Sequence, residues 1–90
     1  MFNKAQRDTN MLPTILRLPA VQSESGLSRS TIYLRIAQGQ WTKPISLGTR
    51  AVGWPSSEVA AINAARIAGK TDEEIRTLVI TLETARKTAA

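Results

Sequence analysis

The fold is decided by the stretch Gly26-Leu27-Ser28-Arg29-Ser30-Thr31-Ile32-Tyr33. Gly26 can adopt the left-handed conformation that ends one helix. Ser28 is a good N-cap for the next helix, because its hydroxyl can accept a hydrogen bond from a free backbone N–H. Ile32 and Ile36 are four residues apart, so they share one helical face and are expected to point into the core. The stretch therefore predicts the turn and the second helix of a helix-turn-helix.

The flanking residues extend this pattern in both directions. Pro19 suits the first turn of a helix, which is predicted over residues 19–25. The second helix is predicted over residues 29–38, with Gly39 ending it. Upstream, residues 14–18 include β-branched residues and show an alternation of apolar and polar side chains, which indicates a short strand or an extended entry segment. Residues 1–13 are polar and predict a disordered or loosely held arm.

A loop at residues 40–44 leads into a second informative stretch. This stretch is Ile45-Ser46-Leu47-Gly48-Thr49-Arg50-Ala51-Val52-Gly53-Trp54. Two short apolar runs, residues 45–47 and 51–54, flank three residues that include a glycine. Such a connection is common in β-hairpins. The hairpin would present Thr49 and Arg50 at its exposed tip.

Two further helices are predicted in the C-terminal part. Ser56 and Glu58 suit the start of a helix that runs to Ala68, with Gly69 ending it. Its weak apolar stripe consists of Val59, Ile62, Ala65 or Arg66, and Ile67. Thr71 and Glu74 form a capping box for a last helix that runs to about residue 87. Arg86 and Lys87 complement the dipole at its end. Its apolar stripe must be buried, either against this domain or against a second copy; its members are Ile75, Leu78, Val79, Leu82 and Ala85.

Composition limits the chemistry available to the 90 residues, a length typical of one domain. The chain has no cysteine and no histidine, so the commonest general base and the commonest metal ligands are missing. An enzyme, a metal site and a cofactor are therefore not expected. No apolar run approaches the roughly 20 residues that span a bilayer, and residues 1–10 lack a signal-peptide core. A cytoplasmic protein is expected.

The charge is distributed unevenly along the chain. Residues 1–54 hold seven basic and two acidic residues, whereas residues 55–90 hold five of each. The whole net charge of +5 therefore lies with the helix-turn-helix and the hairpin. Such a basic region suits nucleic acid, although it could also serve only to keep a small protein soluble.

Several side chains in the basic region are candidates for contact with DNA. Arginine pairs with guanine through two hydrogen bonds, and Ser, Thr and Tyr contact phosphates or base edges, so the start of the second helix is the first candidate. Arg29 could instead be a solvated residue, and Tyr33 either a half-buried core residue or a phosphate contact. Arg50 could enter a narrow minor groove. Lys43 could contact a phosphate or be solvated, whereas the two tryptophans, Trp41 and Trp54, are expected mainly in the core.

Taken together, these motifs resemble those of the AlpA family of prophage regulators over about residues 14–68. The resemblance is carried by the two stretches quoted above together with Leu18-Pro19-Ala20-Val21, Gly39-Gln40-Trp41 and Glu58-Val59. The family is similar to MerR-like winged helix-turn-helix domains and to phage excisionases. Its members regulate the transcription of integrase genes or act as recombination directionality factors.

The resemblance implies which residues contact DNA. The second helix would enter the major groove, and the wing would contact the backbone or the minor groove with Lys43 near it. The implied helix residues are Ser28, Arg29, Ser30, Thr31 and Tyr33, and the implied wing residues are Thr49 and Arg50. The chain departs from the family at Thr42, where a proline is usual, and at Ile62, where a tryptophan is frequent. The helix that begins near Thr71 lies beyond the usual end of the domain.

The sequence thus predicts a mainly α fold with a small β-hairpin. A winged helix-turn-helix at residues 14–69 would follow an arm at 1–13 and precede a C-terminal amphipathic helix at 70–90. Its expected partner is double-stranded DNA, with a second copy, a recombinase or an RNA polymerase as further candidates. An adaptor that docks a recombinase or polymerase through the last helix is the alternative.

Overall fold

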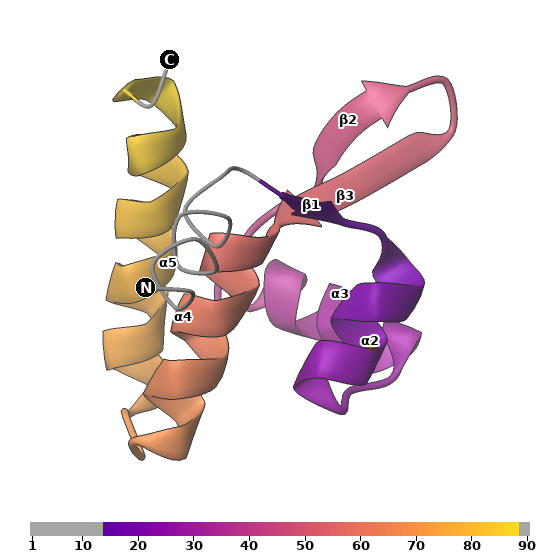
Figure 1. Cartoon of the computed structure of the whole chain (residues 1–90). Helices are drawn as coiled ribbons and strands as arrows, with labels where there is room; N and C mark the ends of the chain where they lie inside the picture. Colours follow the sequence, from indigo (N-terminus) through magenta and orange to yellow (C-terminus); the bar gives the residue numbers. More distant parts are fainter. Residues whose placement is uncertain (1–13, 89–90) are drawn as a thin grey trace, which may run out of the picture.

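The computed structural model describes residues 14–88 and is mainly helical with a small antiparallel sheet, as predicted (Figure 1). The predicted arm at residues 1–13 lies outside the described residues. In Figure 1, helices α4 and α5 stand side by side, α2 and α3 lie beside them, and the hairpin projects away. The elements are β1 (Ile15–Leu16), α2 (Leu18–Ser25), α3 (Arg29–Ala37), β2 (Ile45–Gly48), β3 (Ala51–Pro55), α4 (Ser56–Ile67) and α5 (Asp72–Thr88).

The turn between α2 and α3 has the predicted chemistry. Gly26 has φ 72°, and its N–H donates to the carbonyl of Gln22 at 2.8 Å. Ser28 is the N-cap of α3, and its Oγ accepts from the N–H of Thr31 at 3.2 Å. A left-handed glycine and a side-chain cap satisfy the backbone groups that the two helix ends leave free. The predicted helix boundaries agree with the structure to within one residue.

The sheet has the strand order β1-β3-β2, so the predicted hairpin gains a third strand from the segment before α2. Ile15 pairs with Pro55 and Leu16 with Trp54, while Ile45 pairs with Gly53. A Cβ on Gly53 would lie 2.5 Å from Ile15 Cγ2 and 3.0 Å from the carbonyl oxygen of Leu16. Gly53 is therefore needed where β1 and β3 approach each other closely.

One core joins all parts of the molecule. Both tryptophans lie in it as expected, and Trp54 Nε1 donates to the carbonyl of Thr42 at 2.9 Å. Ile75 and Val79 of α5 belong to the same core, and Leu78 and Leu82 pack against it. The apolar stripe of α5 is thus buried against its own chain. The fully or almost fully buried apolar residues are Val21, Ile32, Trp41, Trp54, Val59, Ile62, Ile75 and Val79.

Ile67 was expected in the apolar stripe of α4, and this prediction is wrong. Its side chain is 87% exposed. At about 100° per residue, Ile67 lies roughly 140° around the helix from buried Ile62. The other predicted members agree with the structure, since Val59 and Ile62 are buried and Ala65 packs against the core.

The two C-terminal helices begin differently. The capping box of α5 is present, because the N–H of Thr71 donates to Glu74 Oε1 at 2.9 Å and the N–H of Glu74 donates to Thr71 Oγ1 at 3.1 Å. In contrast, the predicted serine cap of α4 is absent. Pro55 occupies the N-cap position without a side-chain hydrogen bond. None of the helices over residues 14–88 is long and apolar enough to cross a membrane.

Candidate nucleic-acid interface

The N-terminus of α3 gathers three hydroxyl groups around one cap. Ser28 Oγ lies 2.9 Å from Thr31 Oγ1 and 3.3 Å from Ser30 Oγ. Arg29 and Ser30 are exposed. The first N–H groups of a helix have no intrahelical acceptor and carry a partial positive charge. This end of α3 therefore combines hydroxyls, free N–H groups and a guanidinium, which all favour an anion.

Tyr33 connects this end of α3 to the sheet. Its ring meets the ring of Trp54 edge-on, with centroids 6.3 Å apart and planes at 68°. The guanidinium carbon of Arg29 lies 5.8 Å from the centroid of the Tyr33 ring. Tyr33 is 37% exposed, so its ring both packs on Trp54 and remains accessible to solvent, and the two alternatives for this residue stay predictions. The ring supports the side chain of Arg29 through a cation–π contact.

Thr49 and Arg50 form the tip of the hairpin, as predicted. Gly48 belongs to β2 and pairs with Ala51, so the turn is one residue shorter than expected, with a bulge between Ser46 and Gly48. Arg50 has φ 60°, the left-handed region that costs about 1–2 kcal/mol for a residue with a Cβ. Strain of this kind is frequent at functional positions.

Lys43 lies at the other end of the hairpin. Its side chain is exposed, two residues before β2. Its backbone is held by α5, because its N–H donates to Glu83 Oε2 at 2.8 Å and its carbonyl accepts from Arg86 Nη2 at 2.7 Å. Lys43 is thus near the base of the wing and away from its tip.

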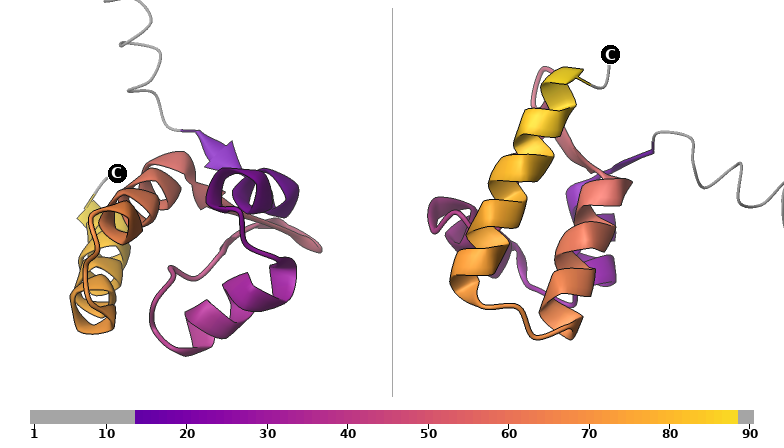
Figure 2. Two further views of the ribbon diagram at one scale, coloured as in Figure 1. Left: turned by 90° about the horizontal axis from the view of Figure 1, so that it is seen from below. Right: turned by 90° about the vertical axis from the view of Figure 1, so that its left-hand side faces the viewer.

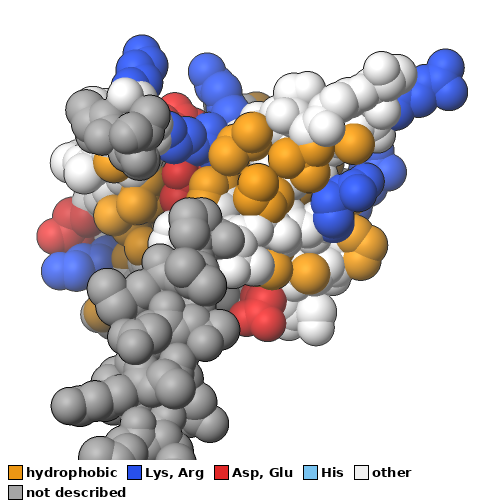
Figure 3. Space-filling view, turned by 45° about the horizontal axis from the view of Figure 1, so that its top comes forward, with side chains coloured by type: hydrophobic (Ala, Val, Ile, Leu, Met, Phe, Trp, Pro, Cys, Tyr) orange, Lys and Arg blue, Asp and Glu red, His pale blue; other side chains and the backbone are white. Residues whose placement is uncertain are grey.

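Ion pairing separates the basic residues into two groups. Among residues 14–88, the ion pairs are Arg66–Asp72, Arg76–Glu73 and Arg86–Glu58, which all belong to α4 and α5. Arg29 and Arg50 form no ion pair within this range, nor does Lys43. Figure 3 shows Lys and Arg side chains projecting at the outer end of the hairpin, beyond a hydrophobic area. Arg29 and Arg50 thus lie unpaired on the two elements that were predicted to contact DNA, while Arg17, Arg35, Lys70 and Lys87 also form no ion pair within residues 14–88.

Leu34 is a candidate that the sequence reasoning missed. Its side chain is 56% exposed and lies one turn along α3 from Ser30. The signal was available, because Leu34 lies two positions, or about 200°, from both Ile32 and Ile36 on the core face. An exposed leucine on this surface suits contact with an apolar group.

Glu58 is a buried carboxylate in the first turn of α4. An exposed carboxylate at this position would also interact favourably with the helix dipole, so the dipole does not explain its burial. It is 4% exposed, and its two oxygens accept from Arg86 Nε at 2.7 Å and Arg86 Nη2 at 2.6 Å. These hydrogen bonds raise the pKa of Arg86. From the sequence, Arg86 was expected only to complement the dipole of α5. In the structure it also binds the buried carboxylate of Glu58.

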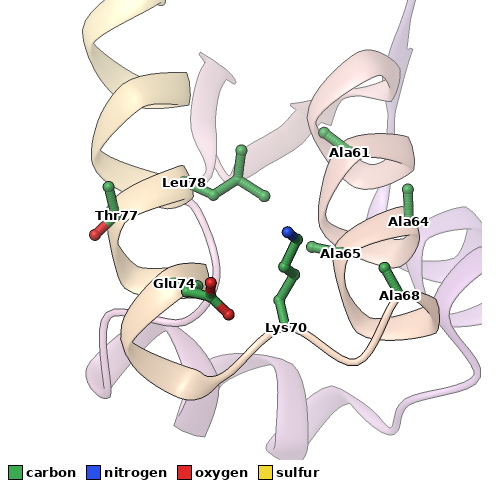
Figure 4. A pocket seen from close by; sticks show the side chains of 8 residues that line it. All are labelled: Ala61, Ala64, Ala65, Ala68, Lys70, Glu74, Thr77 and Leu78. Atoms are coloured by element: carbon green, nitrogen blue, oxygen red, sulfur yellow. The ribbon is translucent and has the colours of Figure 1, made fainter.

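The groove between α4 and α5 offers little chemistry (Figure 4). Four alanines line the α4 side, and Lys70 and Glu74 are its charged residues. Hydrogen bonds from the backbone N–H and from the side chain of Thr71 lower the pKa of Glu74, and the charge of Lys70 adds to this. Over residues 14–88, no group of three or more acidic side chains could hold a metal ion.

Parts of this chain are similar to known proteins. A protein of Enterobacteria phage P4, named "Uncharacterized protein ORF88", is 51% identical over 55 residues, which is 61% of this chain and 62% of that protein. The chain therefore spans less than two thirds of this relative's length. No solved structure gives a significant match. Residues 14–66 match the family model described as prophage CP4-57 regulatory protein (AlpA). This match covers more than half of the chain but not α5, and the chain accordingly belongs to the AlpA family of prophage regulatory proteins.

Proposed function

We propose that this chain binds specific sites on double-stranded DNA as a regulator of a prophage or a related mobile element. In this proposal α3 enters the major groove with Ser28, Arg29, Ser30, Thr31 and Tyr33, and the wing contacts the backbone or the minor groove through Thr49 and Arg50. The observation that carries it is that Arg29 and Arg50, on separate elements, are exposed and form no ion pair with residues 14–88 in a member of a prophage regulator family.

The chemistry of each group defines its role. Arg29 can pair with O6 and N7 of a guanine, and Tyr33 supports its side chain. The hydroxyls around Ser28 and the free N–H groups of the first turn suit a phosphate. Leu34 suits the methyl group of a thymine. Lys43, near the wing base, would reach only a phosphate on a neighbouring part of the duplex.

The adaptor alternative is less well supported than DNA binding. It requires the apolar stripe of α5 to be free for a partner, but Ile75 and Val79 are buried in the core of the chain. Two roles remain within the proposal, transcriptional regulation of integrase or excision genes and direction of excision. The location of the binding site, beside a promoter or within an attachment site, distinguishes them.

The test is selection from a random pool of double-stranded DNA at two salt concentrations, followed by sequencing. We expect one enriched motif and an affinity that falls steeply with salt, because bound phosphates release counterions. Arg29→Ala should lower the affinity by about 1–3 kcal/mol, or roughly 5- to 150-fold, and relax one position of the motif.

Lys70→Ala is the matched control, because it removes one positive charge from the turn between α4 and α5. Its motif and affinity should remain close to those of the original chain. Selection that enriches no motif would refute the proposal. Equal losses for Arg29→Ala and Lys70→Ala would leave only general electrostatic attraction and would equally count against it.

A further inference from the structure

Helix α5 contacts the end of α3, although the family match ends before it. Arg76 Nε donates to the carbonyl of Gln38, the C-cap of α3, at 2.9 Å. The aliphatic part of Arg76 lies against Gly39, where an added Cβ would be 3.7 Å from Arg76 Cγ. The N-terminal part of α5 therefore holds the end of the proposed recognition helix.

The other end of α5 holds the hairpin at both of its ends. Arg86 Nη2 donates to the carbonyl of Lys43, before β2, and the same guanidinium binds the carboxylate of Glu58, after β3. Glu83 accepts from the N–H of Lys43 at 2.8 Å, so both backbone polar groups of Lys43 are bound by α5. One arginine thus connects the two points at which the wing joins the rest of the molecule.

The burial of this ion pair indicates a specific purpose. The side chain of Glu58 is 5% exposed and that of Arg86 is 24% exposed. For an ion pair this far removed from water, the attraction between the charges does little more than offset the cost of desolvating them. Two apolar side chains in the same place often make the fold equally stable. In contrast to an apolar contact, the guanidinium fork defines a direction and a register.

We infer that α5 is a brace that sets the position of the wing relative to α3, with Arg86 as the main positioning residue. The inference rests on the proposed function, since it concerns how two DNA-contacting elements are held for simultaneous binding. Arg76 and Arg86 are ten residues apart, so the brace spans about 15 Å along the helix. If both elements are already held in the arrangement that binds DNA, less conformational entropy is lost on binding.

The test is a pair of double-mutant cycles on the selected DNA site. Arg86→Lys keeps the charge beside Glu58, but a single ammonium lacks the fork that binds Glu58 and the carbonyl of Lys43 together. We expect Arg86→Lys to weaken DNA binding about tenfold, within the range found for coupled residues. The effect should fall below about twofold in an Arg50→Ala background, where the wing contact is already lost, and persist in an Arg29→Ala background. Lys87→Arg, at the exposed neighbouring position, is the control and should change nothing.

A second measurement does not depend on DNA. Residual dipolar couplings of the free protein report the orientation of β3 relative to α3, and Arg86→Lys should change it while circular dichroism confirms that the chain is folded. If Arg86→Lys unfolds the chain, Glu83→Ala replaces it, since this change removes the acceptor for the N–H of Lys43 and a nearby charge, but keeps the hydrogen bonds of Arg86 to Glu58 and to the carbonyl of Lys43.

Each outcome decides a separate point. Equal effects of Arg86→Lys in both backgrounds, or unchanged dipolar couplings, would show that Arg86 only stabilises the fold, and would overturn the brace. A chain that selects no DNA would refute the proposed function, and the dipolar couplings would still decide whether α5 positions the wing.

Discussion

The two halves of the molecule use arginine in different ways. In α4 and α5, Arg66, Arg76 and Arg86 each bind a carboxylate, and two of them also bind a backbone carbonyl of the other half. In α3 and the wing, Arg29 and Arg50 bind no carboxylate among the described residues. The comparison shows that net charge alone does not identify a binding surface. What separates the two halves is whether their arginines have a carboxylate partner within residues 14–88.

The largest effect on the difference between the two halves is expected from removing α5. A chain that ends before Thr71 loses Ile75 and Val79 from the core, each worth about 1.5–3 kcal/mol, and leaves the carboxylate of Glu58 buried and unpaired. Since small domains are stable by only about 5–15 kcal/mol, we expect the truncated chain to be largely unfolded. Thermal circular dichroism tests this, and an unchanged melting temperature would show that α5 adds nothing to the fold.

A single substitution should reproduce part of that loss. Arg86→Met removes the partner of Glu58, and we expect a loss of about 2–4 kcal/mol in the free energy of unfolding, somewhat below the value for fully buried pairs because Arg86 is partly exposed. Urea denaturation measures it. The matched substitution Lys87→Met, at an exposed neighbour, should cost less than about 0.5 kcal/mol. Similar losses for the two variants would contradict the structural use of Arg86.

Replacing Arg50 with glycine is expected to raise the stability of the fold and to lower the affinity for DNA. Arg50→Gly relieves the left-handed backbone at φ 60°, so we expect a gain of about 0.5 kcal/mol in stability, or roughly 2–4 °C in melting temperature. DNA affinity should fall about fivefold on all sequences, with a salt slope lower by about one.

Arg50→Lys is the control for this change, because it keeps both the charge and the strained backbone. It should retain most of the affinity at unchanged stability. A loss of stability in Arg50→Gly would mean that the arginine side chain itself supports the hairpin, which would place Arg50 with the structural arginines of the other half.

The smallest expected effect concerns the capping box of α5. The pKa of Glu74 is lowered in the folded chain, so its charged form adds stability above the unfolded value of 4.5, and this contribution is lost as the pH falls through the folded pKa. Glu74→Gln should therefore be less stable than the original chain at pH 7, and the difference should shrink toward pH 3. Thermal melts across this range measure it. In a Thr71→Ala background the pH-dependent difference should shrink but persist, because the backbone N–H of residue 71 still donates to Glu74 and only the hydroxyl is lost. A difference that disappears completely would assign the effect to the hydroxyl alone.

Much of the fold could be predicted from neighbouring residues. Gly26 and Ser28 define the turn, and Thr71 with Glu74 defines the start of α5, because these contacts join residues no more than four apart and depend only on local backbone geometry. The position of Arg50 at the hairpin tip follows in the same way from the short connection. The contacts of these residues with DNA stay predictions.

Only the tertiary structure decided how the charges are divided. Glu58 and Arg86 are 28 residues apart, and Lys43 and Arg86 are 43 apart, so no local pattern relates them. Tyr33 meets Trp54, and Ile67 and Leu34 are exposed, because the packing of α5 and the sheet covers only one face of each helix. The sequence by itself determined the helices, the hairpin, the caps of α3 and α5, and the basic half. The packing of α5 against α3, α4 and the wing base determined which arginines stay free, because an ion pair forms only where folding brings two distant side chains together.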